Sequence, residues 1–264
     1  MRQRSLVRDY WDSLRHPEFW VYATWLELVT KYRRSRLGMV WAFMPSVIYA
    51  FGVGGFFANI QGQSPQQFIP HLALGYMVFR FIVISLSEST TTCAGHSSFI
   101  LDGRVRLTDY VLRVVAKAAF YFIVAVPVAV IALAMSPTFH WQGLLTFVPA
   151  MVIVLLNVAW MGSLVAVLGA RLPDVHEIIG SVLMFSFLFT PIIWRADQAP
   201  IDTLRGGIAR ANPLFHMVEI VRAPILSEPV EAFSIAYLAV MLVVGWTFAF
   251  LVYRRNARYV PVWL

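Results

Sequence analysis

The sequence carries little charge and almost no cysteine. Only 13% of its 264 residues are charged, against roughly 25% in soluble domains, while 59% are hydrophobic. The single cysteine, Cys93, can form no intrachain disulfide, and we expect it to be a small buried thiol. This composition excludes an ordinary water-soluble domain and a disulfide-stabilised secreted domain. It is typical of a chain that folds in a lipid bilayer.

Patterns of catalysis and metal binding are also missing. The chain has two lysines, Lys31 and Lys117, and neither lies in the G-x-x-x-x-G-K-[ST] loop that holds nucleotide phosphates. The six histidines show no paired ligand spacing, so we predict no metal and no cofactor bound by this chain. No long apolar run contains an acidic residue, which argues against a membrane enzyme and a proton-coupled transporter. Any nucleotide hydrolysis must come from another chain.

Long uncharged runs dominate what is present. A helix needs about 20 residues to cross a hydrocarbon core roughly 30 Å thick, because it rises about 1.5 Å per residue. Six runs come close to or exceed this length and lack the polar stripe of a soluble amphipathic helix: 37–60, 68–87, 118–135, 144–169, 178–194 and 234–253. We therefore predict an all-α membrane protein with six transmembrane helices in a domain of residues 37–253, followed by a cytoplasmic tail at 254–264.

The basic residues indicate how the chain is oriented. If the N-terminus lies inside, sixteen of the 21 Lys and Arg residues fall in inner segments, four fall in outer segments, and Arg80 lies within a span. Short loops rich in these residues stay in the cytoplasm, so we predict that both termini are cytoplasmic. Anionic lipid headgroups account for the net charge of +7, and no nucleic-acid partner is expected. Residues 1–30 lack the compact apolar run of a signal peptide, so we expect none.

A helix on the membrane surface is predicted before the first span. Pro17 suits a first helical position, and residues 17–30 place four apolar side chains on one face: Phe19, Tyr22, Leu26 and Val29. Trp20 and Trp25 add anchors at the membrane surface. Arg and Asp alternate in residues 1–15 without an apolar period. We therefore expect residues 1–36 to form a cytoplasmic tail and an amphipathic interfacial helix.

Two polar residues interrupt the expected spans. Arg80 lies near the middle of its run, where an arginine costs about 2.5–3.5 kcal/mol on insertion scales, so it points to a polar pathway. Asn157 is expected to hydrogen-bond between helices.

Two connecting segments carry further signals. On the inner side, SFILDGRVR at residues 98–106 mixes apolar and charged residues, which fits either a docking surface or a loop packed on its own helix ends. On the outer side, NPLFHMVEIVRAP at residues 212–224 begins with a capping Asn and a Pro, so it predicts a helix that ends near Pro224. Glu219 and Arg222 lie three residues apart and can pair there, as a gate, a sugar contact or an ordinary structural ion pair.

Three strings resemble one family of transporters. KYRRSRLGMVWAFMP at residues 31–45 resembles the stretch that enters the first span of polysaccharide-exporting ABC-2 permeases, which export O-antigen, capsule and teichoic acid. TPIIW at 190–194 resembles the end of that family's fifth span, and NPLFHMVEIVRAP resembles the stretch before its last span. Length, span number and orientation agree over nearly the whole chain. Residues 103–109 lack the Phe-Pro dipeptide of many relatives, which affects the register of a coupling helix there.

The resemblance implies a permease subunit in the bacterial cytoplasmic (inner) membrane that exports a lipid-linked cell-surface polysaccharide. It would form a homodimer around a central channel and pair with two copies of a separate ATP-binding cassette subunit. That partner would hold ATP and magnesium, which agrees with the missing phosphate-binding loop in this chain.

The resemblance also implies site residues. Contact with the ATPase would fall on a coupling helix after the second span: Phe99, Ile100, Leu101 and Asp102. The lipid-linked substrate would enter beside four basic residues whose charge suits a pyrophosphate headgroup: Lys31, Arg33, Arg34 and Arg36. Anchoring at the inner face explains the same four residues without a substrate. Short outer gate helices would occupy residues 196–226, and four residues would serve the translocation path or the gate: Arg80, His216, Glu219 and Arg222.

Two other functions stay open on the sequence. An ABC-2 exporter of a drug or a small lipid would show ATPase activity stimulated by hydrophobic amphiphiles and not by lipid-linked glycans. A membrane enzyme or scaffold of envelope glycan assembly would purify without any ATPase, and replacing one of its acidic residues would stop product synthesis.

Overall fold

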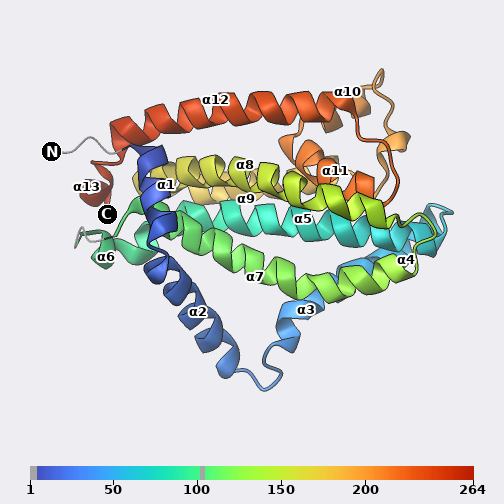
Figure 1. Cartoon of the computed structure of the whole chain (residues 1–264), viewed down its shortest axis with the longest axis horizontal. Helices are drawn as coiled ribbons and strands as arrows, with labels where there is room; N and C mark the ends of the chain where they lie inside the picture. The colour runs from blue at the N-terminus through green and yellow to red at the C-terminus, as the bar shows by residue number, and fades with distance from the viewer. Residues whose placement is uncertain (1–4, 102–104) are drawn as a thin grey trace.

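The computed structural model describes residues 5–101 and 105–264, and it is a bundle of helices (Figure 1). Helix accounts for 81% of the described residues, and these residues contain no strand. This confirms the all-α prediction. The lowest-numbered and highest-numbered helices, α1 (Leu6–Arg15) and α13 (Val260–Trp263), lie at the same end of the bundle.

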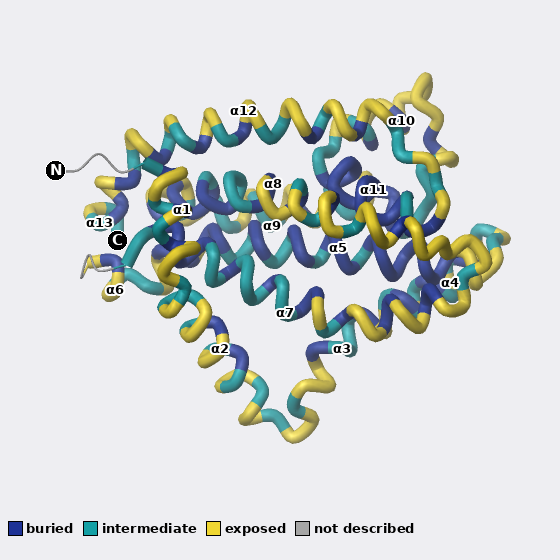
Figure 2. The backbone as a smooth tube through the Cα atoms, in the orientation of Figure 1, coloured by how far each residue is buried: buried dark blue, intermediate teal, exposed yellow. Residues whose placement is uncertain are grey.

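The long helix α5 (Pro65–Thr91) forms the centre of the bundle. In its most apolar stretch 78% of the residues are buried in the protein, against 17% in α12 (Ala232–Asn256), and Figure 2 shows this contrast. Helices α7 (Leu107–Ala134) and α8 (Leu144–Arg171) pack on α5, and α12 packs on α8. The exposed faces of the outer helices are rich in Val, Ile and Leu, which suits contact with lipid.

The first expected span is a helix with a wide turn in its middle. It consists of α3 (Val40–Val47), the π-helical η1 (Ile48–Val53) and α4 (Gly54–Ile60). Pro45 lies inside α3 and has no N–H to donate, so the regular hydrogen-bond ladder is interrupted just before the π-helical turn. Single π-helical turns inside α-helices are frequent at functional sites.

Among the described residues, five helical segments are long and apolar enough to cross a membrane: Val40–Ile60, Pro65–Thr91, Leu107–Ala134, Trp141–Arg171 and Ala232–Asn256. Where the fifth of the six spans is predicted, the structure has the shorter apolar helix α9 (Val175–Phe189). It ends at Phe189. The next residue, Thr190, has an extended backbone, because the proline that follows it disfavours the helical conformation at this position. Residues 190–194 are therefore not helical, and the count of six spans stays a prediction.

The N-terminal region is more ordered than its sequence suggested. Residues 6–15 form α1, whose Leu6 and Tyr10 are buried against other helices, so the expectation of a tail there is wrong. The surface helix is present as α2 (Glu18–Arg33), which leaves the bundle at an angle in Figure 1. Tyr22 and Leu26 of its apolar face are exposed, as an interfacial helix requires.

Short helices close both ends of the bundle. At the end that carries α1 and α13 lie η2 (Ala94–His96) and α6 (Ser97–Leu101). The other end holds α10 (Leu204–Ala211) and α11 (Pro213–Ile225), with the short turns η3 (Trp141–Gly143) and η4 (Ala196–Gln198). Helix α11 is inserted between α5, α8 and α12.

Two single-residue expectations have opposite outcomes. Cys93 is a buried free thiol, as expected. Asn157 is fully buried but forms no bond to another helix within the described residues. Its Nδ2 donates to Ile153 O and its Oδ1 accepts from Trp160 Nε1, both on α8, so the expected interhelical bond is wrong. A buried asparagine can satisfy its amide on its own helix when the neighbouring helix presents only apolar side chains.

Candidate functional site

The four basic residues before the first span lie where α2 ends and turns towards α3. Lys31 and Arg33 are in the last turn of α2, Arg34 is its C-cap, and Arg36 follows. All four are exposed. In the described part of the chain, Arg33, Arg34 and Arg36 have no hydrogen-bond or ion-pair partner. These three charges are therefore free to meet anionic headgroups.

Lys31 differs, because Tyr121 of α7 ties it to the bundle. Lys31 Nζ donates to the Tyr121 hydroxyl oxygen at 2.8 Å, and the Tyr32 hydroxyl donates to the same oxygen at 3.1 Å. The Arg80 guanidinium lies over the Tyr121 ring, 5.1 Å from its centroid, and Arg80 Nη1 donates to Ser46 Oγ at 3.4 Å. Two of the predicted site residues, Lys31 and Arg80, thus meet on one tyrosine.

We call Lys31, Tyr32, Arg80 and Tyr121 the cation–tyrosine cluster. Among residues 5–101 and 105–264, no carboxylate lies within 4.0 Å of either cation. Cation–π contact gives about 0.5–2 kcal/mol, and a tyrosine does not neutralise a charge. The cluster therefore retains two positive charges that an anionic ligand can meet. Sequence reasoning missed Tyr121, because its role depends on α2 crossing α7.

A group of aromatic rings lies next to this cluster, where η1 meets α5. The Tyr49 and Tyr76 rings stack 3.9 Å apart, and Phe187 of α9 packs edge-on against Tyr49. Phe79 of α5 also contacts Phe187, with ring centroids 5.3 Å apart. Tyr76 precedes Arg80 by one helical turn. The stacked tyrosine pair therefore lies one helical turn from Arg80.

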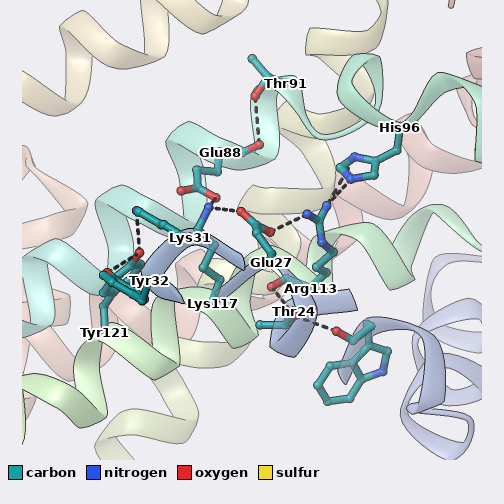
Figure 3. A network of polar contacts seen from close by, with 11 residues as sticks. Thr24, Glu27, Lys31, Tyr32, Glu88, Thr91, His96, Arg113, Lys117 and Tyr121 are labelled. Carbon is teal, nitrogen blue, oxygen red and sulfur yellow. Dashed lines mark hydrogen bonds and ion pairs between the residues drawn. The ribbon is translucent and has the colours of Figure 1, made fainter. Parts of the chain in front are cut away.

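A network of ion pairs joins α2 to α5 and α7 (Figure 3). Glu27 of α2 accepts from Arg113 Nη2 at 2.5 Å and from Lys117 Nζ at 2.6 Å, both on α7. Lys117 also pairs with Glu88 of α5 at 2.8 Å, and Arg113 contacts His96 of η2. Burial opposes ionisation of Glu27, but Lys117 and Arg113 outweigh it and lower its pKa. The network extends from the surface helix to the segment that precedes α6.

The residues predicted to contact an ATPase lie in and just after α6. Phe99 and Leu101 are more than half exposed, whereas Ile100 is buried in a core cluster with Leu107 and Val260. Asp102 lies outside the described residues. The sequence left two alternatives for this segment, a docking surface and a loop packed on its own helix ends. The structure has features of both, because Ile100 packs on the protein's own helices while Phe99 and Leu101 remain exposed. Their contact with an ATPase stays a prediction.

The structure places His216, Glu219 and Arg222 inside the bundle and not on an exposed outer loop. Each is at most 5% exposed. Glu219 accepts from Ser234 Oγ at 2.5 Å, and Arg222 Nη1 donates to the Pro191 carbonyl at 2.5 Å. The Glu219–Arg222 ion pair is absent from the described part of the chain, so that expectation is wrong. The cause is the insertion of α11, which gives both side chains nearer partners on neighbouring segments.

The helix itself follows its sequence signals. Asn212 is the N-cap, and its side chain accepts from Leu214 N while Pro213 occupies the first turn. The helix continues one residue past Pro224 to Ile225. The prediction of a helix in this stretch is confirmed.

Further charged residues, which sequence reasoning missed, surround α11. Arg195 Nη2 pairs with Glu228 Oε1 at 2.7 Å, and Arg210 Nη2 pairs with Glu231 Oε1 at 2.5 Å. His71 Nδ1 lies 3.6 Å from Glu228 Oε1, which is longer than a hydrogen bond. Burial opposes ionisation of Glu228, but His71 and the charges of Arg222 and Arg195 outweigh it and hold its pKa at about 2. The sequence contained a signal for these ion pairs, because basic residues follow α9 and acidic residues precede α12.

We expect the stability contributed by Glu228 to disappear in acid. Its pKa is lower in the folded chain than the ordinary 4.5, so its stabilisation is complete above pH 4.5 and is lost as the pH falls towards 2. A shift of this size corresponds to about 3 kcal/mol. The melting temperature of Glu228→Gln in detergent should be well below that of the wild type at pH 7, and at pH 3 the gap should be less than half as wide. Asp197→Asn, at a carboxylate that is 72% exposed, should show little gap at either pH. An unchanged gap for Glu228→Gln would contradict the assignment.

Comparison with known proteins gives the family. No curated protein matches the chain. Residues 18–226, which are more than half of the chain, match the ABC-2 type transporter family. The matched range runs from α2 through α11, so it includes the cation–tyrosine cluster, the Glu27 network and the inserted helix. With its long apolar helices the chain is an integral membrane protein and belongs to the ABC-2 type transporter family, whose permeases typically pair with an ATP-binding subunit.

Proposed function

We propose that this chain is the transmembrane subunit of an exporter that moves a lipid-linked cell-surface polysaccharide, such as O-antigen or capsule, across the bacterial inner membrane. The cation–tyrosine cluster is the observation that carries the proposal. Within the described residues, Lys31 and Arg80 hold two charges without a carboxylate, which suits a pyrophosphate. The stacked Tyr49 and Tyr76 nearby offer flat faces on which sugar C–H groups can pack.

The proposal includes the partners. Two copies of the chain form the channel, and two ATP-binding cassette subunits hold ATP and magnesium on the cytoplasmic side, where both termini lie. Phe99, Ile100, Leu101 and Asp102 form the contact with the ATPase; the exposed apolar side chains of Phe99 and Leu101 support this. Closure of the ATPase pair then moves α6 and, through the Glu27 network, α2 and α7.

The remaining site residues have separate parts in the proposal. Arg33, Arg34 and Arg36 attract the anionic headgroup at the inner face, and their lack of partners in the described chain supports this. His216, Glu219 and Arg222 hold α11 in place as part of the outer gate. Their burial and their hydrogen bonds to neighbouring segments support this role in positioning the helix.

Replacing Arg80 with glutamine is expected to reduce glycan export about tenfold, because one charge-assisted contact to the headgroup is lost. Cells that lack the gene are complemented with the wild type, Lys31→Gln or Arg80→Gln, and the glycan is measured in cytoplasmic and surface fractions. The glycan should accumulate inside while synthesis continues, and Lys31→Gln should have a smaller effect in the same direction.

Arg254→Gln is the matched control, because Arg254 is an exposed arginine at the end of α12, away from the cluster. It should export like the wild type when the protein is present at equal amounts in the membrane. If no polymer forms in the deletion strain, or if its distribution is unchanged, the polysaccharide proposal is wrong. Stimulation of the ATPase by hydrophobic amphiphiles and not by lipid-linked glycans would instead favour an exporter of drugs or small lipids.

A further inference from the structure

A cavity of about 310 Å³ lies at the end of the bundle that holds α10 and α11. Its walls come from α5, α11 and the segments on either side of α10 and α11, so it lies within a single copy of the chain. Three arginines, four carboxylates and His71 line it. Pockets that bind small molecules begin at about 300 Å³, so the cavity can hold more than a few water molecules.

The charges of this cavity almost cancel. Three guanidiniums face four carboxylates, and two of the pairs are direct, Arg195 with Glu228 and Arg210 with Glu231. The charge balance disfavours a strongly anionic ligand, which would meet the carboxylates, and a strongly cationic one, which would meet the arginines. Among residues 5–101 and 105–264, no group of His, Cys, Asp and Glu has the geometry of a metal site. A neutral polar ligand fits best.

Two residues that line the cavity each carry a buried nitrogen without a hydrogen-bond partner in the described structure. Arg222 is 2% exposed, and its Nε has no partner in the described structure; its one hydrogen bond runs from Nη1 to the Pro191 carbonyl. His71 is 1% exposed; its Nε2 donates to the Trp194 carbonyl at 3.1 Å, and its Nδ1, which is then an acceptor, is also without a hydrogen-bond partner there. Leaving such groups unpaired typically costs about 1–3 kcal/mol each. A hydroxyl group that reached these atoms would remove this cost, because it can accept from Arg222 Nε and donate to His71 Nδ1.

Further acceptors line the same cavity. Asp197 is 72% exposed, and its one ion pair with a described residue is a long one, with Arg195 at 3.7 Å. The Glu228 and Glu231 carboxylates each have two oxygens with several acceptor sites, which one arginine does not fill. A hydroxyl both donates and accepts, so a compact ring with several hydroxyls matches this mixture of free donors and acceptors.

We propose that this cavity is a binding site for one neutral sugar unit, in which Arg222 donates to a hydroxyl oxygen, and His71 Nδ1 and the carboxylates accept from hydroxyl groups. The inference rests on the proposed function only for the source of the sugar, which would be a unit of the exported glycan. The site lies apart from the cation–tyrosine cluster, on the far half of α5, so it would bind the glycan near the end of its path.

The test measures sugar binding by the purified full-length protein in detergent. Methyl glycosides of glucose, galactose and mannose are the neutral probes, methyl glucuronide is the anionic probe and glucosamine is the cationic probe. Saturation-transfer NMR should show millimolar binding of at least one neutral glycoside, with weaker binding of the charged probes. Asp197→Asn should weaken this binding about fivefold, because one acceptor is lost.

Asp202→Asn provides the matched control, since Asp202 is exposed in the same segment and does not line the cavity. It should bind like the wild type. Arg222→Lys should abolish binding if it folds, and Asp197→Asn keeps the test informative if it does not. Failure of all neutral probes to bind, preference for a charged probe, or equal binding by Asp197→Asn would overturn the proposal.

The export assay with Arg80→Gln separates this proposal from the proposed function. If neutral glycosides do not bind but Arg80→Gln still traps glycan inside, only the sugar site is wrong. If glycosides bind but the deletion strain exports glycan normally, the site remains and the exporter proposal is wrong.

Discussion

Replacing Glu27 with glutamine is expected to lower the free energy of unfolding by about 3 kcal/mol. The Glu27 carboxylate is shared by Arg113 and Lys117, whose side chains are only 14% and 12% exposed. Glutamine keeps the size and the helix propensity but leaves one excess positive charge between α2 and α7. Breaking a buried ion pair by removing one partner is costly, because the remaining charge is desolvated without compensation.

The melting temperature in detergent is the direct measurement, and a loss of this size corresponds to a decrease of roughly 10 °C. Glu18→Gln is the matched control, since Glu18 is exposed in the first turn of the same helix and forms no ion pair within the described residues. An exposed charge of this kind contributes only a few tenths of a kcal/mol, so Glu18→Gln should change the melting temperature by less than about 1 °C. Equal decreases for the two variants would mean that the network does not hold α2 to the bundle.

The Glu27 network illustrates which parts of the fold could be predicted from the sequence. Lys117 and Glu88 lie near ends of apolar runs, and the runs themselves predicted the long helices closely, since apolar length is a local property. The N-cap at Asn212 was readable for the same reason, because a cap and its helix are neighbours in the chain. Ion pairs between segments 86 residues or more apart, such as Glu27 with Arg113, depend on packing that no local pattern encodes.

The candidate site was readable only in part. Arg80 was chosen from the sequence because an arginine inside a membrane span is costly, and Lys31 because it belongs to the cluster of basic residues before the first span. Tyr121 was not chosen, because an isolated tyrosine in an apolar run can have many roles. Its contact with Lys31 depends on how α2 crosses α7, which the sequence does not show. The burial of α11 was also missed: its charged residues favour an exposed segment by composition, and only the partners Ser234 and Pro191 make burial possible.

The close contact between α8 and α5 yields a second large expected effect. Replacing Gly169 with alanine should strongly destabilise the protein, because a Cβ at this position would lie 1.9 Å from the Thr90 carbonyl oxygen of α5. The nearest atom belongs to the backbone, so no side-chain rotation can relieve the clash. Gly162, seven residues earlier, also faces α5, and a Cβ there would lie 3.2 Å from Ser89 Oγ. Small residues on one helix face let two backbones approach closely in this way.

The two helices must separate by about 1 Å or more to accept the methyl group, and overpacking of this kind costs about 3 kcal/mol or more. We expect the melting temperature of Gly169→Ala in detergent to fall by roughly 10 °C or the protein to aggregate during purification. Gly180→Ala on α9 is the control, because a Cβ there meets nothing within 4 Å. Alanine favours a helix over glycine by about 0.5–1 kcal/mol, so Gly180→Ala should hold or raise the melting temperature. If Gly169→Ala is as stable as Gly180→Ala, α8 and α5 cannot be packed backbone to backbone as described, and the central position of α5 would need to be revised.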